Sequence, residues 1–299
     1  MILMSFKIGY FADGTWAHNT FDLLIADKEI EISFLVNRVK SKDLILEKKA
    51  KSKNIPILNT KNVNETVFIN KLKEFNTDLF VSMSFDQMIK KQVFEIPNKG
   101  TINCHVGKLP FYRGRHGISW MLINDEKEFG ISVHYIDDGI DTGDLINQEV
   151  FPITDVDTYK SILERSYKEC PRILYKSIKQ IQKDIAFRSP QNLINNHGLY
   201  CTARKDGDEI IDWNQSSRDI FNFIRSISPP GPVATTFIGD KIVKITKSEF
   251  IENAPIYKGI PGAVLVSNPD FLLIKTKDSY LKITEWTSSI KLSVSSRLN

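Results

Sequence analysis

The sequence has few cysteines, no long apolar run and only a small excess of positive charge. Its three cysteines, Cys104, Cys170 and Cys201, are scattered and odd in number, so they form neither a disulfide framework nor a metal-ligand spacing. No run approaches the ~18 to 20 apolar residues of a membrane span, and Met1-Ile-Leu-Met-Ser5 is far too short for the apolar core of a signal peptide. These absences predict a soluble, cytoplasmic protein with no membrane partner and no metal.

The net charge of +4 is small for a protein that binds the phosphate backbone of a nucleic acid, because such proteins concentrate far more positive charge in one patch. From Tyr200 to Asn299 there are 13 Lys or Arg and 11 Asp or Glu, which is close to balanced. We therefore expect no nucleic-acid partner. A dinucleotide-binding fold would place G-x-G-x-x-G after the first strand, and this motif is missing between Ala12 and Asn19.

Strand-like and helix-like segments alternate in the N-terminal half. This alternation predicts an α/β fold with a Rossmann-like, mostly parallel sheet and helices on both faces. The predicted strands are residues 6–11, 31–37, 78–84, 101–106 and 131–136. After the first strand we expect a loop over residues 12–19 before a helix at 20–25. Further helices are expected at 41–53, 64–75 and 155–183, the last kinked or divided by Pro171.

The C-terminal part has a different pattern, with short strand-like runs divided by Pro, Gly and Asn. A capped helix is expected before them, with Arg218 and Arg225 pointing outward. We predict two domains, a catalytic domain over residues 1–195 and a smaller β-rich domain over residues 200–299. The strands of a small antiparallel sheet or barrel are expected at residues 235–237, 241–245, 263–266, 271–276 and 280–285.

The segment from Gly100 to Trp120 carries the side chains best suited to chemistry. Because residues two apart on a strand share a face, Asn103 and His105 lie side by side and Cys104 faces the other way, which rejects Cys104 as a nucleophile. An amide can donate to an oxygen that is becoming negative, and an imidazole can take a proton at neutral pH. The alternative is that His105 is an ordinary structural histidine.

Asp141 is the third polar residue of interest, in the loop Asp137-Asp-Gly-Ile-Asp-Thr-Gly143 that follows a predicted strand. Asp and Gly after a strand are also common turn residues, so composition alone does not assign it a function.

Three ordered motifs resemble those of the folate-dependent formyltransferases: Asn103-Cys-His105, Leu109-Pro-Phe-Tyr-Arg-Gly114 and Asp141-Thr-Gly143. The resemblance implies that Asn103, His105 and Asp141 are catalytic. Asn103 would donate to the tetrahedral oxygen, His105 would remove or relay the proton of the attacking amine, and Asp141 would stabilise the imidazolium.

The resemblance also implies a formyl donor, 10-formyltetrahydrofolate, and no metal. In the family, the segment that matches residues 82–88 and the Asp/Gly loop line the pterin pocket. For each apolar member of this set, core packing is the alternative, and for the loop members the alternative is turn formation. The residues that match are Ser82, Met83, Phe85, Met88, Ile136, Asp137 and Gly139.

The run Arg113-Gly-Arg-His-Gly-Ile-Ser-Trp120 is similar to the Tyr-Arg-Gly-Arg-x-x-x-x-Trp run of the sugar-nucleotide enzymes in this family. It implies that the acceptor is a nucleotide-linked amino deoxysugar, with a dTDP-sugar favoured, of the sort used in bacterial surface polysaccharides such as the lipopolysaccharide O-antigen. A homodimer is expected. The alternatives are methionyl-tRNA formyltransferase and a non-catalytic folate- or nucleotide-binding module. Side chains expected to hold the acceptor are Trp16, Lys108, Tyr112, Arg113, Arg115, Tyr200 and Arg204.

Overall fold

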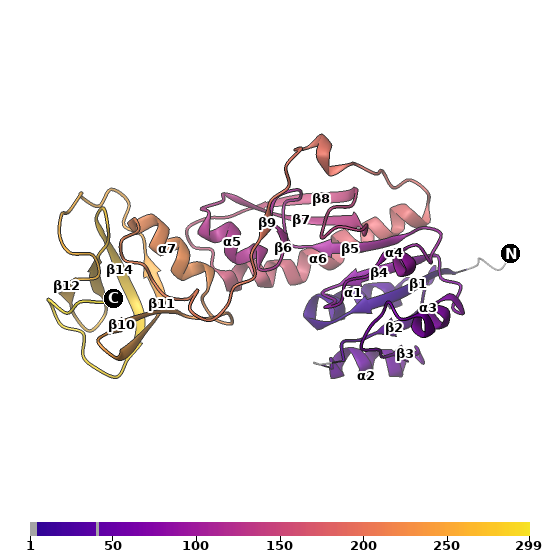
Figure 1. Ribbon diagram of the computed structural model, residues 1–299, viewed down its shortest axis with the longest axis horizontal. Coiled ribbons are helices and arrows are strands. Elements are labelled where there is room, and N and C mark those ends of the chain that lie inside the picture. The colour runs from indigo at the N-terminus through magenta and orange to yellow at the C-terminus, as the bar shows by residue number, and fades with distance from the viewer. Residues whose placement is uncertain (1–4, 40–41) are drawn as a thin grey trace. The chain divides into compact units, whose positions relative to one another are not determined.

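A computed structural model describes residues 5–39 and 42–299 (Figure 1). The prediction about a signal peptide and the first residue of the helix expected at 41–53 fall on residues outside these ranges. The chain forms two compact units. The first unit contains residues up to 114, 130–151 and 165–200, and the second contains residues 115–129, 152–164 and 201–299.

A seven-stranded sheet forms the centre of the first unit, in the order β3-β2-β1-β4-β5-β7-β8. Strands β1 to β5 run parallel to one another, and β7 joins β5 in the antiparallel direction. The prediction of a mostly parallel Rossmann-like sheet is confirmed. The strands are β1 (Phe6–Ala12), β2 (Ile30–Val36), β3 (Ile57–Leu58), β4 (Leu79–Met83), β5 (Thr101–His105), β7 (Glu128–Tyr135) and β8 (Leu145–Pro152).

The helices that accompany the sheet are mostly short, apart from the first and the last. They are α1 (Gly14–Ala26), α2 (Leu44–Ser52), α3 (Thr66–Lys73), α4 (Lys91–Phe94) and α6 (Tyr159–Gln182). Helix α5 (Gly117–Ile123) belongs to the second unit. A two-stranded sheet of β6 (Arg113–Gly114) and β9 (Tyr200–Cys201) and a 3₁₀ turn η1 (Gln191–Leu193) complete the connections.

The centre of the seven-stranded sheet is apolar on both faces, as expected for parallel strands covered by helices. Phe11, Phe34 and Phe80 from three neighbouring strands are fully buried and meet edge to face, with ring centroids 5.1 to 5.9 Å apart. Gly9 makes this possible, because a Cβ at that position would overlap the rings of Phe34 and Phe80.

The loop predicted over residues 12–19 is wrong, because helix α1 already begins at Gly14. The buried residues of α1 are Ala17, Thr20, Phe21 and Leu24, whose spacing is that of one helical face. Thr15, His18 and Asn19, which were predicted in the loop, therefore belong to the helix.

Pro171 was expected to kink or divide the last long helix, but α6 continues from Tyr159 to Gln182 through it. A proline cannot donate to the carbonyl four residues earlier. Here that carbonyl, on Tyr167, accepts instead from the side-chain amide of Asn19 on α1 at 2.9 Å. An outside donor thus replaces the missing helical hydrogen bond.

The second unit contains a five-stranded antiparallel sheet in the order β10-β11-β14-β13-β12, which confirms the predicted β-rich C-terminal part. Helix α7 (Ser217–Ser226) packs its apolar side chains into the core of this unit. The strands are β10 (Ala234–Ile238), β11 (Lys241–Glu249), β12 (Val264–Ser267), β13 (Leu272–Lys275) and β14 (Tyr280–Ser288).

The outward position predicted for Arg225 is wrong. Its side chain is buried and donates to the carbonyl of Thr154 at 2.7 Å. Arg218 forms ion pairs with Asp125 and Asp155. Both arginines therefore connect α7 to other segments of the second unit, and the acidic partners explain their position. None of the described helices is both long and apolar enough to cross a membrane.

Candidate active site

Strand β5 presents Asn103 and His105 on one face, where both side chains are half-buried. Ser82 on β4 lies directly beside Asn103 in the sheet register. Cys104 faces the other way and is buried, with its sulfur near the carbonyl of Cys170 on α6. The alternation that argued against Cys104 as a nucleophile is therefore present in the structure.

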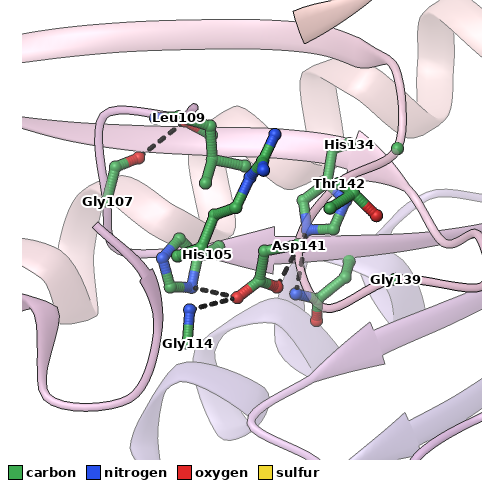
Figure 2. Close-up of polar contacts among 12 residues, drawn as sticks. His105, Gly107, Leu109, Gly114, His134, Gly139, Asp141 and Thr142 are labelled. Atoms are coloured by element: carbon green, nitrogen blue, oxygen red, sulfur yellow. Dashed lines mark hydrogen bonds and ion pairs between the residues drawn. The ribbon is translucent and has the colours of Figure 1, made fainter. Parts of the chain in front are cut away.

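The loop after β7 returns Asp141 to this face of β5. Figure 2 shows its carboxylate between the rings of His105 and His134. Oδ2 of Asp141 lies 3.6 Å from Nδ1 of His105 and accepts the main-chain N–H of Gly114 at 2.8 Å. Oδ1 lies 3.3 Å from Nε2 of His134. The three residues expected to act together thus lie around one point.

The surroundings of Asp141 keep its carboxyl group ionised. Burial would raise the pKa of its carboxyl group, but His105, His134 and the N–H of Gly114 outweigh burial and lower the pKa well below the usual value. The carboxylate is therefore ionised throughout the neutral range. An anion of this kind can stabilise an imidazolium that forms beside it.

The hydrogen bonds of His105 fix its tautomer. Its Nε2 lies 2.7 Å from the carbonyl oxygen of Tyr112, and since a carbonyl only accepts, Nε2 carries the proton. Nδ1 is then the basic nitrogen, and it faces Asp141. Gly107 gives the ring room, because a Cβ there would clash with Nε2 of His105. A proton taken at Nδ1 would create a cation directly beside the carboxylate.

His134 was not among the catalytic residues predicted from the sequence. It lies opposite Asn103 in the antiparallel pairing of β5 and β7, and its side chain is almost fully buried. Its Nδ1 donates to the carbonyl of Tyr135 at 2.7 Å, and its Nε2 lies 3.3 Å from the amide nitrogen of Asn103. Only the antiparallel register, which the sequence did not reveal, brings His134 to this point.

The residues predicted to line a pterin site lie on two segments. Ser82 and Met83 are buried at the end of β4, and Phe85 stacks edge to face on Phe11 at 5.6 Å. Ile136 packs against the same apolar cluster as Phe85. Met88 is exposed beyond β4, while Gly139 and Asp137 belong to the loop after β7, where the N–H of Gly139 donates to Asp137.

The residues predicted to hold the acceptor are divided between the two units. Trp16 donates to Ser166 at 2.9 Å and packs on Tyr167, so it has a structural role. Arg113 donates to Gln191, and Tyr200 lies beside that guanidinium. Of the others in the first unit, Tyr112 supplies the carbonyl that binds His105, and the main chain of Lys108 packs closely on Gly130. The second unit contains Arg115 and Arg204.

The second unit contains a cavity of about 570 Å³. Arg204, Lys205 and Lys244 line it together with His116 and the Pro-Gly turn that follows α7. Burial, together with the charges of Arg204 and Arg115, lowers the pKa of His116. Arg204 lies 5.9 Å from the ring of Trp120 and donates to the carbonyl of Asp208, so its guanidinium is held at the cavity wall. Asp206 and Glu209 line the same cavity, so it presents both cationic and anionic side chains.

A Rossmann-like sheet that carries a carboxylate, two imidazoles and a carboxamide around the end of one strand has the groups that proton transfer and oxyanion stabilisation require. Comparison with known proteins gives the family. Residues 29–178 match the formyl transferase family and residues 204–297 match the formyl transferase C-terminal domain. The chain belongs to the formyl transferase family, whose members are enzymes that transfer formyl groups.

Among its relatives, the methionyl-tRNA formyltransferase of Thermodesulfovibrio yellowstonii is 32% identical over 77% of this chain and 71% of the relative. The structure of WlaRD, a sugar 3N-formyltransferase in the presence of dTDP and 5-N-formyl-THF, covers 98% of this chain and all of its own, with a TM-score of 0.70 and 26% identity. The N-formyltransferase of Helicobacter canadensis, in complex with folinic acid and dTDP-3-aminofucose, has the same fold, with a TM-score of 0.71, 95% coverage of this chain, 100% of its own and 22% identity.

Proposed function

We propose that this protein transfers a formyl group from 10-formyltetrahydrofolate to the amine of a nucleotide-linked amino deoxysugar, with a dTDP-sugar favoured. One observation carries the transfer chemistry: the Asp141 carboxylate lies within 3.6 Å of two imidazoles, and one of these, His134, lies 3.3 Å from the amide nitrogen of Asn103. Formyl transfer requires an acceptor for the amine proton and a donor for the developing oxyanion. These residues supply both.

Each residue of the set has a task that follows from its contacts. Asn103 donates from its amide to the oxygen that becomes negative when the amine attacks, a contribution of about 2.7 to 4 kcal/mol for comparable donors. His105 accepts the amine proton at Nδ1, while Nε2 stays bonded to the carbonyl of Tyr112. Asp141 stabilises the resulting imidazolium, and the proton then passes to the leaving nitrogen. His134 holds the other oxygen of Asp141.

The residues of the first unit fit a folate. A pterin is flat and largely apolar, with polar edges that main-chain groups can meet. Met88 and Ile140 are exposed apolar side chains on the two predicted segments, and Phe85 and Ile136 pack on one apolar cluster beneath. When bound, the folate supplies the formyl group. Main-chain and apolar side-chain groups of these segments would hold its ring.

Three observations support a sugar-nucleotide acceptor. The likeness to WlaRD extends over 98% of this chain, including the second unit. The cavity lined by Arg204, Lys205 and Lys244 includes cationic donors of the kind that bind a diphosphate, beside the carboxylates of Asp206 and Glu209. The charges from residue 200 onward are nearly balanced, whereas phosphate contacts dominate the affinity of tRNA-binding proteins. The relative at 32% identity makes methionyl-tRNA the alternative acceptor.

The deciding experiment incubates the purified protein with 10-formyltetrahydrofolate and a panel of dTDP-, UDP- and GDP-linked amino sugars, and follows the gain of one formyl group by mass spectrometry. A parallel reaction contains charged initiator methionyl-tRNA. We expect formylation of a dTDP-amino sugar and none of the tRNA. Formylation of methionyl-tRNA alone would contradict the proposed acceptor but retain the transfer chemistry. If Asp141→Asn still formylates the acceptor at the wild-type level, the proposed site is contradicted.

A further inference from the structure

Gln191 is a buried amide in an otherwise exposed segment. It begins the 3₁₀ turn η1 and is only 3% exposed, although Leu193, two residues later, is 77% exposed. Burying an amide without hydrogen bonds costs free energy, so a buried glutamine in such a segment needs partners. Its partners lie at the catalytic loop.

The side chain of Gln191 uses all of its hydrogen-bonding capacity. Nε2 donates to the carbonyls of Asp141 and Gly143, each at 2.8 Å. Oε1 accepts from Nε and Nη2 of Arg113 at 3.2 and 2.7 Å. Because carbonyls only accept and a guanidinium only donates, the amide has one possible orientation. Exchanging its oxygen and nitrogen would break all four bonds.

The loop that Gln191 holds needs such support. Asp141 has a φ of 54°, in the left-handed region that is unfavourable for a residue with a side chain. The loop is also tightly packed, because a Cβ at Gly143 would clash with the carbonyl of Tyr135. Bonds to the carbonyls of Asp141 and Gly143 hold the backbone on both sides of Thr142.

Arg113 and its neighbour Gly114 are connected to Asp141 in two ways. Its chain neighbour Gly114 donates to the carboxylate of Asp141, while its guanidinium reaches the carbonyl of Asp141 through Gln191. Gly198 leaves space for that guanidinium, because a Cβ there would clash with it. Both the side chain and the main chain of Asp141 are thus connected to residues 113 and 114.

We propose that Gln191 is a positioning residue that holds the Asp141 loop in its reactive geometry, and that Arg113 acts through Gln191 rather than on the acceptor. The inference rests on the proposed role of Asp141 in formyl transfer. It gives the guanidinium of Arg113 a different use from the predicted one, which was to hold the acceptor.

The first test compares Gln191→Met with Arg113→Met and with the double variant. We expect kcat to fall by about 10²-fold in Gln191→Met, as for other small displacements of a reacting group, with little change in KM for either substrate. If Arg113 acts through Gln191, the double variant loses no more activity than Gln191→Met. Additive losses, or a rise in KM for the nucleotide sugar in Arg113→Met, would overturn this role for Arg113.

Two further variants separate positioning from general stability. Gln191→Glu keeps an acceptor for Arg113 but removes both donors to the loop, so it too should lose kcat. Asn147→Asp is the control, since the amide of Asn147 donates to Ser177 and Gln180 in the same unit and does not contact the loop. It should keep the wild-type kcat, whatever its effect on Tm. Full activity in Gln191→Glu would overturn the proposal.

A readout without substrate keeps this test independent of the acceptor. NMR spectra at one fixed pH follow the ring resonances of His105 and His134 in the wild type and in Gln191→Met, which has the same charge. Displacement of the loop moves the Asp141 carboxylate away from both rings, so the ring resonances of both should change their chemical shifts in the variant. Unchanged resonances would overturn the positioning role even if the protein formylates a different acceptor.

Discussion

Replacing Asp141 by asparagine removes one charge from the site and keeps the size of the side chain. The carboxylate lies 3.6 Å from Nδ1 of His105, and the two side chains are only 13% and 11% exposed. At an effective dielectric constant of about 20, a full charge pair at that distance is worth about 4 to 5 kcal/mol. We therefore expect kcat to fall by about 10³-fold if the imidazolium forms in the transition state.

The assay is steady-state formylation of the acceptor found in the screen, with KM measured for both substrates. KM should change little, because the interaction develops with the transition state rather than with binding. Asp138→Asn is the matched control: it makes the same charge change in the same loop at an exposed position, and its kcat should equal that of the wild type. A near-normal kcat in Asp141→Asn would refute the proposed role of the carboxylate and the proton path through His105.

Three further predictions concern the same site. His134→Ala removes a partner of Asp141, and the loss of a charge-assisted contact worth about 1.5 to 3 kcal/mol should lower kcat by about 10- to 100-fold in the same assay. Gly107→Ala should displace the ring of His105 and lower kcat by up to about 10²-fold while far-UV circular dichroism stays unchanged; a wild-type rate would show that the ring is not confined there. Because the pKa of Asp141 is lowered by folding, its ionised form stabilises the protein above pH ~4 and this contribution is lost as the pH falls. Urea unfolding of the wild type and Asp141→Asn should therefore give free energies of unfolding that converge in acid.

The alternation of strands and helices predicted the sheet and its mainly parallel direction, because apolar runs and their spacing are local properties. The same local information failed at α1, where Asp13 and Gly14 look like a turn although the residues after them continue a helical face. It also failed at Pro171, because the donor that replaces its missing N–H comes from Asn19, far away in the chain.

The site was predicted only as far as single strands allow. Asn103 and His105 share a face of one strand, so their proximity follows from the sequence. His134 and Gln191 approach Asp141 through an antiparallel register and through a loop about 50 residues further on, and neither relation has a local signal. The acceptor-binding predictions stay predictions, although Trp16 already has structural partners in Ser166 and Tyr167.

The chain leaves the first unit after Gly114 and re-enters it at Gly130, while every side chain around Asp141 comes from segments outside that excursion. Under the proposed function, substitutions within residues 115–129 should therefore change the preferred acceptor without removing any group around Asp141. We propose this excursion as the place to introduce a new acceptor preference.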